Sequence, residues 1–240
     1  PIPGSIRLLG ESATMEQPSV QEPRPAATVI AARPASTAAA RAGVEVLVLQ
    51  RSSGSRFLPG YVVFPGGAVD AGDTELAQRW FGDRAESTRA CAVRELAEET
   101  GLALTGGGLV PADGVELGTI HAFPPSARAL HQISHWIAPE EVPVRFDARF
   151  FAVAARSGVE PQPDGAEADR AWWVDPRALL RDFEAQRCDL YWPTLKTVEA
   201  LAECASVEEV LALDLPQIEG DDGEHDPEAA QSPDAAGISE

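Results

Sequence analysis

Three glutamates near the middle of the chain have the residue type and the spacing of a metal-binding cluster. Glu95, Glu98 and Glu99 stand at positions i, i+3 and i+4, so a helix would place them on one face within an arc of roughly 100°. Clustered carboxylates repel one another, and they become favourable around a hard divalent cation such as Mg²⁺, which prefers carboxylate and water oxygens. Gly101 is the expected end of this helix, because glycine accepts a positive φ just past the last turn. The alternative is a solvated acidic helix face without a ligand.

The residues around these glutamates extend the pattern in both directions. Residues 94–102 read Arg-Glu-Leu-Ala-Glu-Glu-Thr-Gly-Leu, and Glu86 precedes Arg94 by seven intervening residues. This stretch resembles the C-terminal half of the Nudix box, Gly-x5-Glu-x7-Arg-Glu-U-x-Glu-Glu-x-Gly-U, in which U is a bulky aliphatic residue. The front half of the box matches an earlier stretch, in which Gly67 is followed by five residues and then Asp73. We therefore interpret the box as split by an insertion from Thr74 to about Arg84, and either Asp73 or Glu86 could fill its first acidic position, behind the metal ligands.

A second motif precedes the box. Arg51-Ser52 is followed by three residues and Arg56, in a loop rich in Ser and Gly that leads to Gly60 and to Phe64-Pro65-Gly66-Gly67. This spacing is similar to the extra signature of coenzyme A diphosphatases within the Nudix family, although Leu49 stands where that signature has Thr. Two arginines on a glycine-rich loop beside a metal site suit phosphate oxygens, which they can bind bidentately. The alternative is that one or both form surface ion pairs.

Two further stretches resemble the branch that contains the eukaryotic peroxisomal coenzyme A diphosphatases. These stretches are residues 135–139 and 145–151. Residues 91–95, Cys-Ala-Val-Arg-Glu, also match a run of that branch. The box of that branch likewise carries an insertion. The C-terminal residues, 238–240, are not a peroxisomal address. The resemblance spans roughly residues 26–212 and implies a hydrolase of coenzyme A or acyl-CoA.

The resemblance also implies roles for the metal-site residues. Glu95, Glu98 and Glu99 would be ligands of Mg²⁺ or Mn²⁺, and Glu98 or Glu99 would contact the metal-bound water. Arg94 would orient the carboxylates through an ion pair. The glycines of the turn, Gly66 and Gly67, would let the backbone approach metal and phosphates closely.

The general base is expected on a later loop, as in many Nudix enzymes. Glu167 is the candidate because it lies shortly before Trp172 and Trp173, and Asp169 is the alternative. Each could equally be a solvated loop charge.

Three other functions are compatible with the chain. A Nudix pyrophosphatase could act on ADP-ribose, dinucleotides or NTPs instead of coenzyme A. A non-catalytic Nudix module could sense a nucleotide, but the intact carboxylates and the lack of a basic helix-turn-helix segment argue against it. The acidic C-terminal segment could bind another protein in any of these cases.

Composition limits the partners. The net charge is −19, and the segment after Leu213 contributes nine acidic residues with no Lys or Arg, which leaves −10 for the rest. This balance argues against non-specific binding to nucleic acid or to an anionic membrane, but not against a phosphate-bearing small molecule. Three widely spaced cysteines, no signal-peptide pattern and no apolar run near 18 residues indicate a cytoplasmic protein. Relatives of this type often dimerise, so a homodimer is possible.

The order of expected elements is that of a mixed α/β layer protein, in agreement with the α/β/α sandwich and mixed sheet that the Nudix resemblance implies. We expect a poorly ordered arm at 1–25, the Nudix domain at 26–212 and a disordered acidic tail at 213–240. Strands are expected at 26–32, 44–50, 61–64, 115–121, 132–137, 147–154 and 171–174, and helices at 74–82, from Asp83 or Ser87 to 100, from 175, at 193–204 and at 206–211.

Two groups of side chains have uncertain roles. His131 and His135 would form a zinc pair on a helix, but a strand is expected there, which favours core or surface histidines. Trp136, Trp172 and Trp173 are expected to pack in the core, with stacking on a nucleotide base as the alternative.

Overall fold

The computed structural model describes residues 22–35, 43–55, 57–112, 127–140, 144–163, 165 and 167–219. The strand predicted at 115–121, Arg56, most of the predicted N-terminal arm and the tail beyond 219 lie outside these ranges. In the described part of the chain, no helix has both the length and the apolar character needed to cross a membrane.

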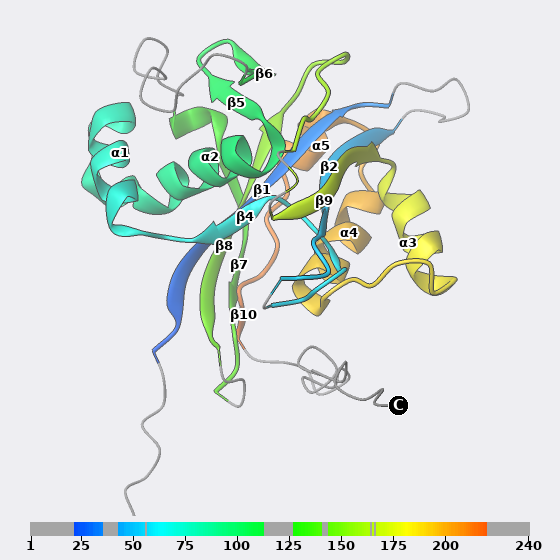
Figure 1. The fold of residues 1–240 in the computed structure, drawn as a ribbon. Coiled ribbons are helices and arrows are strands. Elements are labelled where there is room, and N and C mark those ends of the chain that lie inside the picture. Colours follow the sequence, from blue (N-terminus) through cyan, green and yellow to red (C-terminus); the bar gives the residue numbers. More distant parts are fainter. Residues whose placement is uncertain are drawn as a thin grey trace, which may run out of the picture.

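An eight-stranded mixed sheet forms the centre of the molecule (Figure 1). Its strands are β1 (Arg24–Pro34), β2 (Val44–Arg51), β3 (Val62–Val63), β4 (Gly66–Ala68), β7 (His131–Ile137), β8 (Phe146–Ala154), β9 (Ala168–Val174) and β10 (Ile218–Glu219). The order is β10-β7-β8-β1-β2-β3, with β4 also paired to β1 and β9 to β2. β1 runs parallel to β8 and antiparallel to β2 and β4, so the predicted mixed sheet is confirmed.

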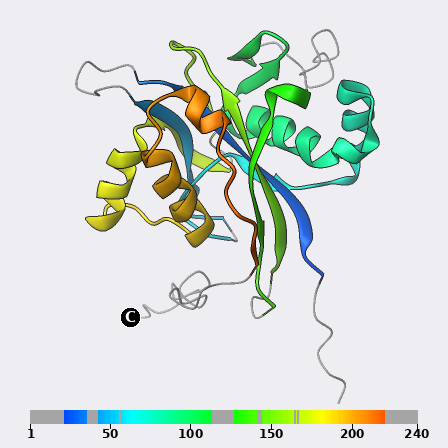
Figure 2. The same ribbon diagram turned by 180° about the vertical axis from the view of Figure 1, so that it is seen from behind.

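Helices cover both faces of this sheet (Figures 1 and 2). On one face lie α1 (Ala71–Phe81) and α2 (Ser87–Thr100), joined by the short helix η1 (Arg84–Glu86). On the other lie α3 (Pro176–Glu184), α4 (Trp192–Ala202) and α5 (Val207–Leu211). A short helix, η3 (Ala127–Ala129), precedes β7, and a hairpin of β5 (Leu102–Thr105) and β6 (Gly108–Pro111) follows α2. This is the α/β/α sandwich that the sequence predicts.

Strand β1 is buried on both faces, and this explains its nearly continuous apolar sequence. Val29 and Ala31 belong to the hydrophobic cluster under α1 and α2, whereas Ile30 and Ala32 belong to the cluster under α3, α4 and α5. Successive side chains of a strand point to opposite faces, so a central strand between two helical layers needs apolar residues at every position.

Helix α1 begins earlier than predicted, at Ala71 rather than at residue 74. Asp70 Oδ1 accepts hydrogen bonds from the backbone N–H of Gly72 and Asp73, and Asp73 Oδ2 accepts one from the N–H of Asp70. This reciprocal capping box starts the helix inside the front half of the motif. The insertion therefore continues a helix that the motif itself begins.

Neither predicted cap starts helix α2 with its side chain. Asp83 Oδ1 instead accepts from the N–H of Ala85 and caps η1, and α2 follows directly from Ser87 without a side-chain cap. Gly106 and Gly107 form the turn of the β5–β6 hairpin.

The tail prediction is wrong for residues 213–219. Leu215 donates a backbone hydrogen bond to Ile133, and Ile218 pairs with Trp136 as part of the parallel strand β10. The acidic composition concealed this order because the binding surface is the edge of β7, whose unpaired backbone groups accept a neighbouring strand of almost any sequence. At the other end, β1 begins at Arg24, two residues before the predicted start of the domain.

Candidate active site

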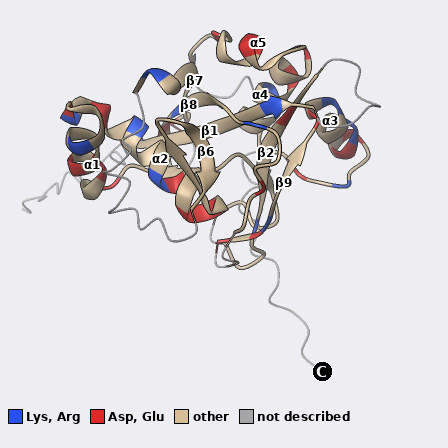
Figure 3. Ribbon diagram, turned by 90° about the horizontal axis from the view of Figure 1, so that it is seen from above, with Lys and Arg blue, Asp and Glu red and all other residues tan. Residues whose placement is uncertain are grey.

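Helix α2 presents the three predicted glutamates near its C-terminal end, where Figure 3 shows the acidic part of α2. Glu95 and Glu99 are buried, with 9% and 5% of their surface exposed, whereas Glu98 is exposed. Gly101 ends the helix with a φ of 66°, as the sequence predicts. A Cβ at this position would lie 2.6 Å from the carbonyl oxygen of Gln162, so the loop packed against the helix end also requires glycine.

Arg94 holds two of these carboxylates. Its Nη1 donates to Glu95 Oε1 at 2.8 Å and to Glu98 Oε2 at 2.9 Å. Its Nη2 donates to the backbone carbonyl of Ala68, beside the glycine turn. One guanidinium thus fixes both carboxylates relative to β4, the geometry expected of a residue that positions metal ligands.

Asp73 binds the other side of the Arg94 guanidinium. This contact distinguishes Asp73 from Glu86, the two candidates for the first acidic position of the box. Asp73 is fully buried, and its two oxygens accept from Arg94 Nε at 2.8 Å and Nη2 at 3.0 Å. Glu86 lies at the N-cap of α2, about 13 Å from Glu95 along the helix axis. There it pairs with Arg89 and remains partly exposed. The structure therefore brings Asp73 to the site and does not bring Glu86 there.

The glycine turn touches both buried glutamates. Gly66 donates its N–H to Glu99 Oε2 at 2.8 Å. A Cβ on Gly67 would lie 2.3 Å from Glu95 Oε1, and one on Gly66 would lie 2.4 Å from the carbonyl oxygen of Ala27. The backbone of β4 therefore approaches the carboxylates more closely than any residue with a side chain allows.

We predict that Gly67→Ala moves the Glu95 carboxylate and weakens Mn²⁺ binding by at least about tenfold, a typical effect of disturbing a ligand's support. Overpacking should also cost about 1–3 kcal/mol of unfolding free energy. Isothermal titration with Mn²⁺ and thermal unfolding measure the two effects. Gly54→Ala is the matched control, because its nearest neighbour would be Ser52 Oγ at 3.8 Å. Equal Mn²⁺ affinity in the two variants would contradict the placement of Glu95.

Burial dominates the electrostatics of this cluster. It raises the pKa of Glu99 to about 8; the neighbouring carboxylates of Glu95 and Glu167 raise it further, while the N–H of Gly66 and the guanidinium of Arg51 oppose the rise. Burial likewise raises the pKa of Glu95, against the effect of Arg94. Buried carboxylates whose pKa stays raised despite Arg94 and Arg51 are a donor set that fits a hard divalent cation.

Within the described residues, no three His, Cys, Asp or Glu side chains already converge as a ready-made metal cage. In this arrangement one oxygen of Glu95 and one of Glu98 accept from Arg94, and one oxygen of Glu99 accepts from Gly66. A cation would use the remaining oxygens of the three carboxylates.

Arg51 and Glu167 lie together at the end of strands β2 and β9. Arg51 pairs with Ala168 in the sheet, and the carbonyl oxygen of Glu167 accepts the N–H of Ser52. The Arg51 Nε donates to the carbonyl of Phe57 at 2.9 Å, and its charge also acts on Glu99. Glu167 is exposed. The structure thus brings both predicted residues to the edge of the carboxylate cluster, and their catalytic roles remain predictions.

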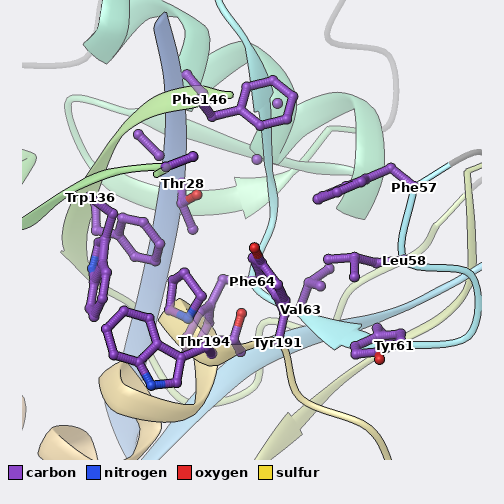
Figure 4. Close-up of a pocket in the computed structure, with 18 of the residues that line it drawn as sticks. Thr28, Phe57, Leu58, Tyr61, Val63, Phe64, Trp136, Phe146, Tyr191 and Thr194 are labelled. Atoms are coloured by element: carbon purple, nitrogen blue, oxygen red, sulfur yellow. The ribbon is translucent and has the colours of Figure 1, made fainter. Parts of the chain in front are cut away.

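An apolar chamber of about 460 Å³, on the α4 side of the sheet, was not predicted from the sequence (Figure 4). Its wall contains side chains from the loop before β3, from β7 and β8, and from the start of α4. The larger ones are Phe57, Leu58, Tyr61, Val63, Phe64, Trp136, Ile137, Phe146, Phe150, Leu190, Tyr191 and Trp192. One sequence signal could have revealed it: Phe146, Ala148 and Phe150 alternate along one strand, so they share one face.

The tryptophans and histidines with uncertain roles lie in different parts of the molecule. Trp136 lines the chamber, whereas Trp173 packs under Arg33 with its Nε1 bonded to the carbonyl of Val159. Trp172 lies under the guanidinium of Arg170 and packs against the cluster under α3 to α5. His131 and His135 both lie on strand β7, where residues i and i+4 are about 13 Å apart, too far for a shared zinc ion.

The comparisons with known proteins agree with the fold and the site. Residues 23–191 match the NUDIX domain family, and the chain belongs to that family. It is similar to the crystal structure of a NUDIX hydrolase from Alicyclobacillus acidocaldarius, with 30% identity, a TM-score of 0.70, and coverage of 82% of this chain and 100% of that one.

Two curated relatives are more distant. Acyl-coenzyme A diphosphatase NUDT19 of Homo sapiens is 26% identical over 238 residues, covering 70% of this chain and 63% of that protein. A family member from Caenorhabditis elegans is 27% identical over 174 residues, covering 66% of this chain and 56% of that protein. The chain therefore spans less than two thirds of the length of the curated relatives it matches.

Proposed function

We propose that this protein is a metal-dependent diphosphohydrolase, and that its substrate is coenzyme A or an acyl-CoA. The observation that carries the proposal is the arrangement around one guanidinium: Arg94 holds Glu95 and Glu98, while Glu99 is held by the N–H of Gly66 at the same turn. Cleavage of the diphosphate would give 3′,5′-ADP and 4′-phosphopantetheine. ADP-ribose, dinucleotides and NTPs are the competing substrates.

The site would work with Mg²⁺ or Mn²⁺, which when bound neutralises the charge of the diphosphate and makes a coordinated water more acidic. Glu95, Glu98 and Glu99 would hold this ion. Arg51 would bind phosphate oxygens, since a guanidinium offers paired donors in the geometry of a phosphate. The close backbone of Gly66 and Gly67 would let the diphosphate lie against β4.

The attacking water must lose a proton as it adds to phosphorus. Glu167 is the proposed acceptor, because it is exposed to solvent at the edge of the cluster and its charge acts on both Glu95 and Glu99. Asp169, also exposed, is the alternative on the same segment.

Three observations support coenzyme A over the competing substrates. The Arg51 loop is similar to the coenzyme A diphosphatase signature, and it lies beside the carboxylates, as that role requires. The human relative is named an acyl-coenzyme A diphosphatase. The large apolar chamber beside β4 suits a substrate with a long, uncharged arm better than one with charge at both ends.

We expect metal-dependent cleavage of coenzyme A and acetyl-CoA by the wild type. In Glu98→Gln, kcat should fall by about 10²-fold or more, because one metal-binding carboxylate is lost. Chromatography of the products from a panel of coenzyme A, acetyl-CoA, ADP-ribose, NADH, a diadenosine polyphosphate and dNTPs, each with Mg²⁺ and with Mn²⁺, measures this. The exposed Glu208→Gln on α5 is the matched control and should leave turnover unchanged.

Each outcome of the panel has a distinct meaning. Cleavage of ADP-ribose or a dinucleotide, without cleavage of coenzyme A, would keep the metal chemistry and overturn the substrate. Binding of a nucleotide without turnover of any compound would indicate a nucleotide-sensing module instead.

A further inference from the structure

The apolar chamber and the carboxylate cluster share part of their walls. Gly66 and Gly67 line the chamber and also contact Glu99 and Glu95. Arg51 lines the chamber and acts on the charge of Glu99. A substrate whose diphosphate lies against β4 can therefore extend one of its two halves into the chamber, and the structure bears on which half that is.

The charge of the chamber excludes one half of coenzyme A. Among the chamber-lining residues that the structure describes, Arg51 alone is charged, and it lies at the wall shared with the carboxylates. For a phosphate buried elsewhere in the chamber, the described lining residues offer no cationic partner, which makes its transfer from water very unfavourable. The 3′-phosphate of the adenosine half therefore does not fit inside.

The aromatic side chains of the chamber also do not form a slot for a base. The Phe57 ring meets Phe146 at 60° and Tyr191 at 78°, so neither pair is parallel. Trp136 is 5% exposed and meets Trp192 edge-on at 4.9 Å, which leaves little of its face for stacking. Figure 4 shows Phe57, Trp136 and Phe146 on different sides of the space.

The size of the chamber fits a longer group than a purine. Its volume of about 460 Å³ is about three times the roughly 150 Å³ that hold one benzene molecule in a protein cavity. By this ratio it holds about 18 non-hydrogen atoms, as many as pantetheine has, against about 10 in adenine.

We infer that the chamber binds the pantetheine arm of the substrate and that the adenosine half lies outside it. This inference rests on the proposed function. The branched aliphatic part of the arm would contact the aromatic wall, and its amides and hydroxyls would meet the hydroxyl groups of Thr28, Tyr61 and Thr194. Pro139 and the exposed Val144 continue the apolar lining to the surface, where an acyl group on the arm would emerge.

The test compares the two halves of coenzyme A as separate ligands. Pantetheine, 4′-phosphopantetheine and 3′,5′-ADP are titrated calorimetrically, with Mg²⁺, into wild type, Ala148→Phe and Ala154→Phe. Ala148 lines the chamber as the third residue of β8, and Ala154 is the matched control, exposed at the end of the same strand. We expect pantetheine to bind the wild type without any phosphate. We expect Ala148→Phe to weaken 4′-phosphopantetheine at least about tenfold and 3′,5′-ADP less than about twofold.

Three results would overturn the inference. They are a loss of 3′,5′-ADP affinity without a loss of 4′-phosphopantetheine affinity, equal affinities in all three proteins, and no binding of pantetheine to the wild type. The last result needs no variant, so misfolding of Ala148→Phe does not remove the test. Failure of the proposed function is separate, since it appears as wild-type protein that does not cleave coenzyme A.

Discussion

Replacing Asp73 by Asn is expected to destabilise the protein by about 3–5 kcal/mol, the usual cost of breaking a buried ion pair by removing one charge. The described groups that hydrogen-bond to the Asp73 carboxylate are donors: Nε and Nη2 of Arg94, the backbone N–H of Asp70 and the thiol of Cys91. The NH₂ group of Asn would have to face at least one of them. Arg94 would then lose the partner that fixes it, and Glu95 and Glu98 would lose their common support. Urea unfolding and Mn²⁺ titration measure both consequences, and Mn²⁺ affinity should fall at least about tenfold.

Glu86→Gln is the matched control for this prediction, because Glu86 is the other candidate for the same place in the motif. Its partner Arg89 is about a quarter exposed, and pairs of this kind contribute about 0–1 kcal/mol. We expect a loss below about 1 kcal/mol and unchanged Mn²⁺ affinity. Equal effects of the two substitutions, or a larger effect of Glu86→Gln, would contradict the assignment of Asp73.

This choice between two acids shows where sequence spacing stops being informative. Local spacing predicted the α2 helix, its end at Gly101 and the common face of Glu95, Glu98 and Glu99, because all of these depend on residues within a few turns of one another. The partner of Arg94 lies 21 residues away along the chain, and only the path of α1 through space brings it close.

The chamber illustrates the same limit on a larger scale. Its wall combines Phe57, Trp136, Phe146 and Tyr191, which come from four separate segments. Each segment alone reads as an ordinary strand or loop, and only the folded chain brings the four segments together around one chamber. Strand β10 is similar, since the order of the tail depends on the free edge of β7 rather than on the composition of the tail.

The metal-free protein is expected to lose stability as the pH rises from about 4.5 to about 8, because of Glu99. Folding raises the pKa of this carboxyl from 4.5 to about 8, so the folded protein holds a proton that the unfolded chain releases across this window. The stabilising contribution is fully present below pH 4.5 and is lost as the pH passes 8. Each pKa unit corresponds to about 1.4 kcal/mol, so the loss amounts to several kcal/mol at most.

Glu99→Gln isolates this contribution, because the amide keeps the size of the side chain and cannot ionise. In EDTA, the unfolding free energy of the variant minus that of wild type should increase from pH 5 to pH 9, by up to several kcal/mol. A difference that stays constant over this range would contradict the assignment. Gly66 still donates to the amide oxygen of Gln, so the turn itself need not change.

The same proton links stability to the proposed metal. Mg²⁺ or Mn²⁺ can bind Glu99 only after the carboxyl ionises, so binding below pH 8 should release about one proton. Calorimetry at pH 7 in buffers of different ionisation enthalpy measures the number released. Below pH 8 the affinity should rise up to about tenfold per pH unit, and saturating Mg²⁺ should remove the loss of wild-type stability between pH 5 and 8. The burial that makes Glu99 costly as a free anion is therefore what would make the site respond to a divalent cation.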